Sequence, residues 1–343
     1  MQLQKVFTDV RVLLMVGVSA MFLGLSALWL GYYRAVPAEK GAPVVITVTK
    51  GMTAETIGAL LYEKGLISNV TMFRIVARME GLETSLQAGE YSISPGMTIR
   101  EIVSLLAEGR TIRYSFTIPE GYTVDQIAKL LEEKKLANAE KFKALARDFA
   151  PYPYMVPTSP GVVYKAEGFI FPDTYSVSRG ITEEELLKLM VSQFDRKFTP
   201  AMRQRAEAAG MSIRDVVTLA SLVEREARLP KERPIIARVF LNRLQKEMPL
   251  QSCATIQYIL GYPKPELTIK DTQIPSPYNT YLNQGLPPGP VANPGMAAIE
   301  AVLNPAQNDY LYFVVDGTGG HRFSRTYEEH LAAISKLEAE EHQ

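Results

Sequence analysis

A strand–turn–helix pattern occurs three times in the first part of the chain and limits its fold more than any other feature. The copies are ITVTKGMTAETIGALLYEKGL (46–66), YSISPGMTIREIVSLLAEGR (91–110) and FTIPEGYTVDQIAKLLEEKKL (116–136). Each copy alternates as a short strand, turns at a glycine and opens a helix with a threonine, and the last two have capping-box spacing. The apolar positions of the helices are in register, so each helix buries one face.

The first copy is followed by a predicted second helix near 70–80 and a predicted strand at 89–93. This strand–helix–helix–strand order makes residues 44–110 resemble the LysM module, a glycan-binding fold. A shared fold does not establish a shared function. Two interpretations therefore stay open, a glycan-binding module and purely structural β–α units.

Residues 12–33, VLLMVGVSAMFLGLSALWLGYY, form a run of 22 residues without a charge. As a helix the run would extend for about 33 Å, enough to cross the hydrocarbon core of a bilayer. The alternative is a cleaved signal peptide, but its apolar core is shorter, roughly 7–15 residues, and ends at a small-x-small site. We therefore expect a short cytoplasmic tail (1–11), a retained transmembrane helix (12–33) and a linker (34–43).

The composition argues against several classes of function. The 37 basic and 37 acidic residues give a formal net charge of zero, so no long-range field attracts nucleic acid. The single cysteine, Cys253, excludes an intrachain disulfide, and we expect a small, half-buried side chain there. Three scattered histidines without a zinc motif argue against a metal site. We expect no metal, no cofactor and no nucleic-acid partner.

The stretch SIRDVVTLASLVEREARL (212–229) predicts a long helix with an acidic capping box at its start. Its apolar residues share one face, and Glu224 and Glu226 lie at opposite edges of that face. Burial beside apolar neighbours favours the protonated form of a carboxyl group, as a general acid requires. The alternative for Glu224 is a rim carboxylate that pairs with Arg228 one turn later. Geometry alone does not choose between the two glutamates.

Residues 275–295 contain six prolines and three glycines, too many for a helix or a central strand. Proline lowers the entropy lost when a loop becomes ordered, so this segment predicts a long rigid loop. The loop offers two tyrosine faces for sugar rings and several amides for hydroxyl and N-acetyl groups. A purely structural, proline-rich lid with buried tyrosines is the alternative.

Long motifs in the second half resemble those of the endolytic murein transglycosylases, membrane-anchored enzymes that cut nascent peptidoglycan strands. The matching segments are EGFIFPDTY (167–175), LASLVEREA (219–227), ARVFLNRL (237–244), MPLQSCATIQY (248–258), SPYNTYLNQGLPPGPVANPG (276–295) and YLYFVVDGTGGHRFSRTYEEH (310–330). The resemblance implies that Glu224, the first glutamate of LAS-x-V-E-x-E, is the catalytic residue. This chain departs from many members in having Cys253-Ala254 where they have Asp-Pro.

The resemblance also implies a site and its partners. The residues expected to line the glycan cleft are Gln251, Ser252, Thr255, Asn279, Tyr281, Asn293 and His321. The expected fold is α+β: the transmembrane helix, the LysM-like β–α module (44–110) and a mixed α+β catalytic domain (111–343). The expected enzyme is a carbon–oxygen lyase on the outer side of the cytoplasmic membrane, with glycan strands as substrate and cell-wall synthases (penicillin-binding proteins) as candidate partners.

The expected chemistry needs only one carboxyl group. Glu224 would protonate the leaving glycosidic oxygen, and its carboxylate would then accept the proton of the muramoyl C6 hydroxyl as a 1,6-anhydro ring closes. A lysozyme-like peptidoglycan hydrolase, which needs a second carboxylate, is one alternative, with Glu167 or Asp173 as candidates. A non-catalytic, membrane-tethered wall-binding scaffold is the other.

Overall fold

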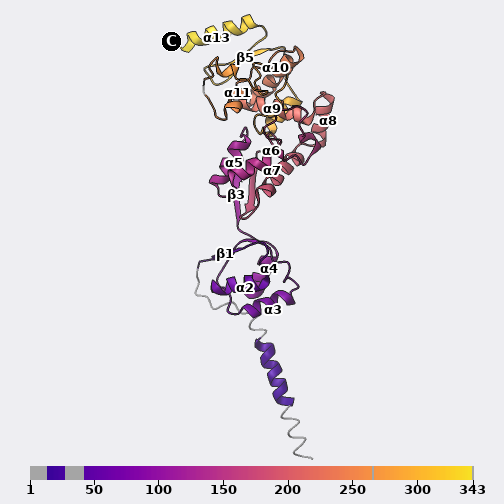
Figure 1. Ribbon diagram of the computed structural model, residues 1–343, viewed down its shortest axis with the longest axis vertical. Coiled ribbons are helices and arrows are strands. Elements are labelled where there is room, and N and C mark those ends of the chain that lie inside the picture. Colours follow the sequence, from indigo (N-terminus) through magenta and orange to yellow (C-terminus); the bar gives the residue numbers. More distant parts are fainter. Residues whose placement is uncertain (1–13, 28–41, 265, 342–343) are drawn as a thin grey trace, which may run out of the picture. The chain divides into compact units, whose positions relative to one another are not determined.

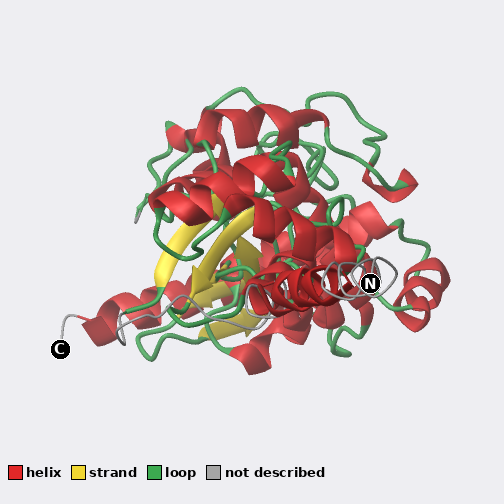
Figure 2. Ribbon diagram, turned by 90° about the horizontal axis from the view of Figure 1, so that it is seen from below, coloured by secondary structure: helices red, strands yellow, loops and turns green. Residues whose placement is uncertain are grey.

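The computed structural model describes residues 14–27, 42–264 and 266–341. Most of this part of the chain is helical, and its strands are short and few (Figure 2). The strands form three two-stranded sheets among the described residues, with the pairs β1–β2, β3–β4 and β5–β6. The structure is therefore a mixed α+β fold in which helices predominate, as expected.

The described chain divides into two compact units. The first contains the residues up to 114 together with 176–180, and the second contains 115–175 and the residues from 181 onward. The elements of the first unit are β1 (Val44–Val48), α2 (Ala54–Glu63), α3 (Val70–Met79), β2 (Gly89–Ile93) and α4 (Ile99–Ala107) (Figure 1). The order β1–α2–α3–β2 confirms the strand–helix–helix–strand expectation.

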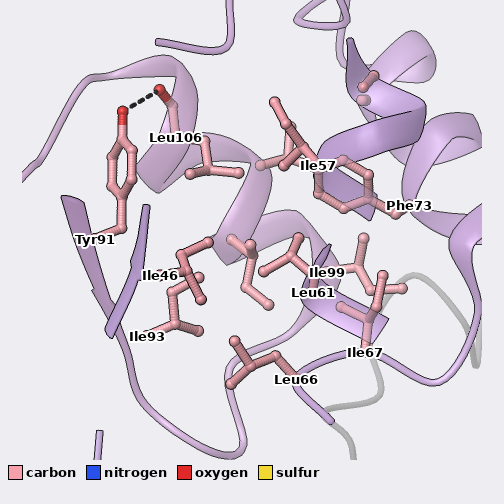
Figure 3. Close-up of a cluster of buried hydrophobic side chains, with 14 of the residues drawn as sticks. Ile46, Ile57, Leu61, Leu66, Ile67, Phe73, Tyr91, Ile93, Ile99 and Leu106 are labelled. Carbon is pink, nitrogen blue, oxygen red and sulfur yellow. Dashed lines mark hydrogen bonds between the residues drawn. The ribbon is translucent and has the colours of Figure 1, made fainter. Parts of the chain in front are cut away.

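The core of the first unit forms between the β1–β2 ribbon and its three helices. The strands are antiparallel, with Ile46 opposite Tyr91. The Tyr91 ring is fully buried, and its hydroxyl donates to the carbonyl oxygens of Gln87 at 2.7 Å and Leu106 at 3.3 Å; Figure 3 shows the second of these bonds beside the apolar cluster. Both bonds satisfy a polar group that burial would otherwise leave unpaired.

The third copy of the repeated pattern belongs mostly to the second unit. Its strand is β3 (Arg113–Thr117), paired with β4 (Thr174–Ser178), and its helix is α5 (Val124–Glu133). The capping boxes predicted at Thr98 and Thr123 are both present. The same local sequence pattern is thus used in two different packing environments.

The second unit is built around α9 (Ile213–Glu226) (Figure 1). This helix packs against α8 (Pro200–Ala208), α10 (Arg233–Gln245), α11 (Cys253–Leu260) and α12 (Met296–Leu303). Residues 216–223 of α9 are all buried, so the helix is enclosed on every side, whereas the sequence predicted a single buried face. The helix also ends three residues earlier than expected, at Glu226. Leu229 has an extended backbone (φ −100°, ψ 128°), the conformation that the following Pro230 favours.

The second unit contains further elements. They are α6 (Ala139–Asp148), α7 (Glu183–Lys197), β5 (Tyr312–Val315), β6 (His321–Ser324), α13 (Tyr327–Glu341) and the 3-10 turns Pro153–Met155, Pro230–Glu232 and Asp271–Gln273. Of these, α6 packs on α5 and α7, and α13 packs on β5 and β6. Between α11 and α12, the proline-rich segment has no α-helix or strand, as the sequence predicts.

Part of the predicted membrane span is described. Residues 14–27 are helical and exposed. Among the described residues, no helix combines the length and apolar character needed to cross a membrane. The remaining positions of the expected span, together with the expected tail (1–11) and most of the expected linker (34–43), lie outside the described residues.

Candidate active site

Glu224 lies in the last turn of α9, and its carboxyl group is held by two donors from distant segments. Its side chain is only 7 % exposed. Oε1 accepts a hydrogen bond from Arg233 Nη2 at 3.2 Å, and Oε2 accepts one from the backbone N–H of Gly295 at 3.0 Å. Arg228 lies beyond the end of the helix, so the rim pairing at i+4 is wrong. Glu224 is instead a fixed carboxyl group of the second unit.

Arg233 brings a second carboxyl group, that of Glu120, close to Glu224. Arg233 opens α10, and its side chain is 16 % exposed. The same Nη2 atom that bonds Glu224 lies 3.9 Å from Glu120 Oε2. Burial, and then the charge of Glu224, raise the pKa of Glu120, while Arg233 lowers it. One guanidinium group thus interacts with two carboxyl groups.

Glu120 was not predicted as a site residue, although the third repeated copy differs from the other two at this position by having a carboxyl group. It precedes the turn glycine of the third repeated copy, where the first two copies have Lys50 and Pro95. The two oxygens that face Arg233 lie no farther apart than the sum of the 3.2 and 3.9 Å distances. This upper limit allows the carboxylate separation of retaining glycosidases, about 5–5.5 Å, and the lower end of the range found in inverting ones, about 6.5–9.5 Å.

The two carboxylates that the sequence offered as partners have other roles. Glu167 is fully buried and accepts from the Val124 N–H, Asn293 Nδ2 and Tyr258 Oη. Burial raises the pKa of Glu167 to about 8, against the lowering effect of these donors. Asp173 accepts from Gln193 Nε2 at 2.7 Å. The carboxyl group that shares a partner with Glu224 is therefore that of Glu120.

Glu226 belongs to a different group of side chains, as its position on the helix predicted. Its Oε1 accepts from Ser252 Oγ at 2.5 Å, and burial raises the pKa of Glu226. Ser252 is 3 % exposed. The fully buried Thr255 donates to the Ser252 carbonyl oxygen at 2.7 Å. Glu226 and Ser252 thus join the end of α9 to the start of α11.

Gln251 and Tyr281 are the predicted cleft residues that remain accessible. Gln251 is exposed and has a left-handed backbone (φ 52°), and its Oε1 accepts from Arg243 Nη1 at 3.3 Å. Tyr281 is half-buried, with its hydroxyl 3.3 Å from Cys253 Sγ. Burial raises the pKa of Tyr281. Cys253 is exposed, so the expectation of a half-buried thiol is wrong; it opens α11 rather than facing the core.

Three other predicted residues are buried and bonded within the protein. Asn279 donates to the carbonyl oxygens of Thr272 and Ile274 and accepts from the Tyr281 N–H. Asn293 and His321 are also buried, and His321 Nδ1 lies 2.7 Å from Glu232 Oε2. These bonds place Asn279, Asn293 and His321 in the framework of the site. Their contact with a glycan stays a prediction.

A cavity of about 350 Å³ lies on the side of α9 that carries Arg225, the residue after Glu224. Arg225 Nη2 donates to Gln257 Oε1 at 3.2 Å in the wall of this cavity. The wall also contains the tyrosines 164, 258, 262 and 278. Aromatic faces with a few polar groups form a common type of ligand site. In the described ranges, no group of three or more His, Cys, Asp or Glu side chains could hold a metal ion.

Comparison with known proteins gives consistent matches over most of the chain. The endolytic murein transglycosylase of Bacillus subtilis (strain 168) is 32 % identical over 314 residues, which cover 88 % of this chain and 87 % of that protein. The protein of the same name from Streptococcus pneumoniae (strain D39) is 34 % identical in an alignment of 323 positions that covers 86 % of this chain. The matched part spans 58 % of the pneumococcal protein's length.

A solved structure and a family profile agree with these matches. The 2.6 Å crystal structure of a YceG-like protein from Listeria monocytogenes is 34 % identical, with a TM-score of 0.60, covering 86 % of this chain and all of that one. The profile of the YceG-like family matches residues 46–336. This range covers most of the chain and every residue of the candidate active site, and the chain therefore belongs to the YceG-like family.

Proposed function

We propose that the protein is an endolytic lytic transglycosylase that cleaves the MurNAc–GlcNAc bond of nascent peptidoglycan strands and so limits their elongation. The observation that carries this proposal is the position of Glu224. Its carboxyl group is nearly buried and is fixed by Arg233 and the Gly295 N–H. The neighbouring 350 Å³ cavity has the next residue, Arg225, in its wall and not Glu224 itself. The names of the relatives in Bacillus and Streptococcus support the same activity.

In the proposed reaction Glu224 acts first as acid and then as base. The protonated carboxyl group gives its proton to the glycosidic oxygen as the bond from that oxygen to C1 of MurNAc breaks. The resulting carboxylate then accepts the proton of the C6 hydroxyl, and the C6 oxygen bonds to C1. The product has a 1,6-anhydromuramoyl end, the proton returns to Glu224, and no water is consumed.

The second candidate is a lysozyme-like hydrolase, and the nearby carboxyl group of Glu120 is the observation that favours it. A hydrolase would use that carboxylate to activate water or to attack C1, and its product would have a reducing muramic acid end. The transglycosylase product is lighter than the hydrolase product by one water molecule, so mass spectrometry separates the two.

The test is the digestion of purified glycan strands with the wild-type protein. We expect anhydromuramoyl ends at internal cleavage points, identified by chromatography with mass detection. Reducing ends would show that the hydrolase interpretation is right. Strands that bind the protein but are not shortened would favour the wall-binding scaffold.

We also propose that residues 12–33 hold the protein in the cytoplasmic membrane, with the residues that follow on the outer side. The uncharged run of 22 residues supports this proposal. We expect the full-length protein to stay in the membrane fraction after an alkaline carbonate wash. A variant that begins at residue 42 is the control and should be soluble. Release of the full-length protein by the wash, or a mature N-terminus after residue 33, would contradict the proposal.

A further inference from the structure

We infer that Glu120 is a positioning residue that keeps Glu224 able to take up a proton, by sharing Arg233 with it. This inference rests on the proposed function only in assigning the acid role to Glu224. Three features carry it: the shared guanidinium group, the fit of Glu120 against Gly295, and the nature of the donors that hold Glu224.

Both donors to Glu224 favour its charged form. A guanidinium group and a backbone N–H can only donate, so each stabilises a carboxylate better than a carboxylic acid. The acid step nevertheless requires a protonated carboxyl group. A site with these two donors alone would suit a general base better than a general acid. A further group that disfavours the charged form of Glu224 is therefore needed.

Glu120 supplies that effect in two ways. Its carboxylate repels the negative charge of Glu224, and it competes for the same Arg233 nitrogen, 3.9 Å from its Oε2. The Glu120 side chain is 49 % exposed, so water screens part of this interaction, but the Arg233 and Glu224 side chains are only 16 % and 7 % exposed, which keeps the contact effective. Partial burial, and then the charge of Glu224, raise the pKa of Glu120. The uptake of a proton by Glu224 relieves the repulsion and frees Arg233 for Glu120.

Gly295 allows this arrangement because it has no side chain. A Cβ atom at position 295 would lie 1.9 Å from Glu120 Oε1 and 2.1 Å from its Cδ, far inside contact distance. The backbone of Gly295 (φ −74°, ψ 168°) is one that alanine adopts readily. The glycine is therefore not required by the backbone. It provides the space in which the Glu120 carboxyl group lies beside the N–H that binds Glu224.

The charged residues next to Glu224 and Arg233 in the sequence have partners of their own. Arg225, the next residue of α9, bonds the Gly121 carbonyl oxygen and Gln257. Glu232, which precedes Arg233, is paired with His321 Nδ1. From α12, the group that faces Glu224 is the Gly295 N–H. Of the charged side chains around Glu224, Arg233 and Glu120 are thus the two that act on its carboxyl group through one shared contact.

The test is the pH dependence of product release, measured from about pH 4 to pH 9 for Glu120→Gln and Gly295→Ala. Glutamine removes the charge, so Arg233 binds Glu224 alone and protonation becomes harder. We expect the alkaline limb of the profile, where activity falls as the pH rises, to lie at a pH lower by about one unit than in wild type. At a fixed pH on that limb, the rate should be roughly tenfold lower. The methyl group of Gly295→Ala should displace the Glu120 carboxyl group and cause a smaller shift in the same direction.

Three further variants complete the experiment. Glu120→Asp keeps the charge and should move the limb back toward the wild-type position. The double variant Glu120→Gln, Gly295→Ala should have the same pH profile as Glu120→Gln alone, because the methyl group at position 295 then has no charged group to displace. Glu207→Gln, on the exposed face of α8, is the matched control for the loss of one negative charge and should leave the profile unchanged.

An unchanged limb in both Glu120→Gln and Gly295→Ala, or a shift toward higher pH, would overturn the role of Glu120. Thermal unfolding shows whether Glu120→Gln is folded, and if it is not, Gly295→Ala decides. The proposed function is judged separately, by anhydromuramoyl ends that wild type releases and Glu224→Gln does not. If the ends are reducing, the same profiles still test Glu120, because a hydrolase also needs the proton of Glu224.

Discussion

Replacement of Glu224 by glutamine is expected to abolish nearly all release of anhydromuramoyl products, with a loss of roughly 10²–10⁴-fold. Glutamine keeps the shape of the side chain and an oxygen for Arg233 or Gly295, but it has no proton to give near neutral pH. The upper part of the range is expected because one group acts in both halves of the reaction. Chromatography of digested glycan strands with mass detection measures the loss.

Glu226→Gln is the matched control on the same helix. Its new amide keeps an oxygen that can accept from Ser252 Oγ, so the link between α9 and α11 should persist and most activity should remain. Activity in Glu224→Gln together with none in Glu226→Gln would move the catalytic role by two residues. Activity in both would show that α9 is not the catalytic helix.

Asn293→Ala is expected to lower the free energy of unfolding by about 3–5 kcal/mol. The fully buried amide donates to the Tyr122 carbonyl oxygen and to Glu167 Oε1, and it accepts from the Ile170 N–H, each at 2.9 Å. Truncation leaves the Ile170 N–H without this acceptor, at a cost of roughly 1–3 kcal/mol for a buried unpaired group. It also removes one hydrogen bond each, about 1 kcal/mol, from the Tyr122 carbonyl oxygen and from Glu167, which keep other donors. Denaturant unfolding of the chain from residue 42 onward measures the change.

The control is Asn283→Ala, in the same proline-rich loop. Asn283 is exposed, and its amide donates to the carbonyl oxygens of Ser276 and Asn279, which water can reach after truncation. Its loss should cost less than about 1 kcal/mol. If Asn293→Ala unfolds like wild type but binds glycan strands poorly, Asn293 is a binding residue and the structural interpretation fails.

Features that depend on a few neighbouring residues were predictable from the sequence. The capping boxes at Thr98, Thr123 and Ser212 follow from a side chain three residues later, and all are present. The divergence of Glu224 and Glu226 follows from 100° per residue on a helix. Pro230 indicated the end of α9 to within a few residues.

Features that depend on chain segments far apart were not predictable in this way. The contact of Glu120 and Glu224 with one arginine requires the third repeated copy, α9 and α10 to come together, and no periodicity encodes that meeting. The burial of α9 on all sides depends on four other helices. In the sequence, Asn293 cannot be distinguished from an exposed amide that binds glycan. Only its burial in the folded chain shows that it supports the structure of the site.

The order in which the chain is synthesised gives the Gly295 contact a further consequence. Glu224 takes its two hydrogen bonds from Arg233 and Gly295, both of which are made after it. Because synthesis proceeds from the N-terminus, some 70 further residues must be added after Glu224 before the Gly295 donor exists. A nascent or truncated polypeptide that ends before Gly295 cannot assemble this site.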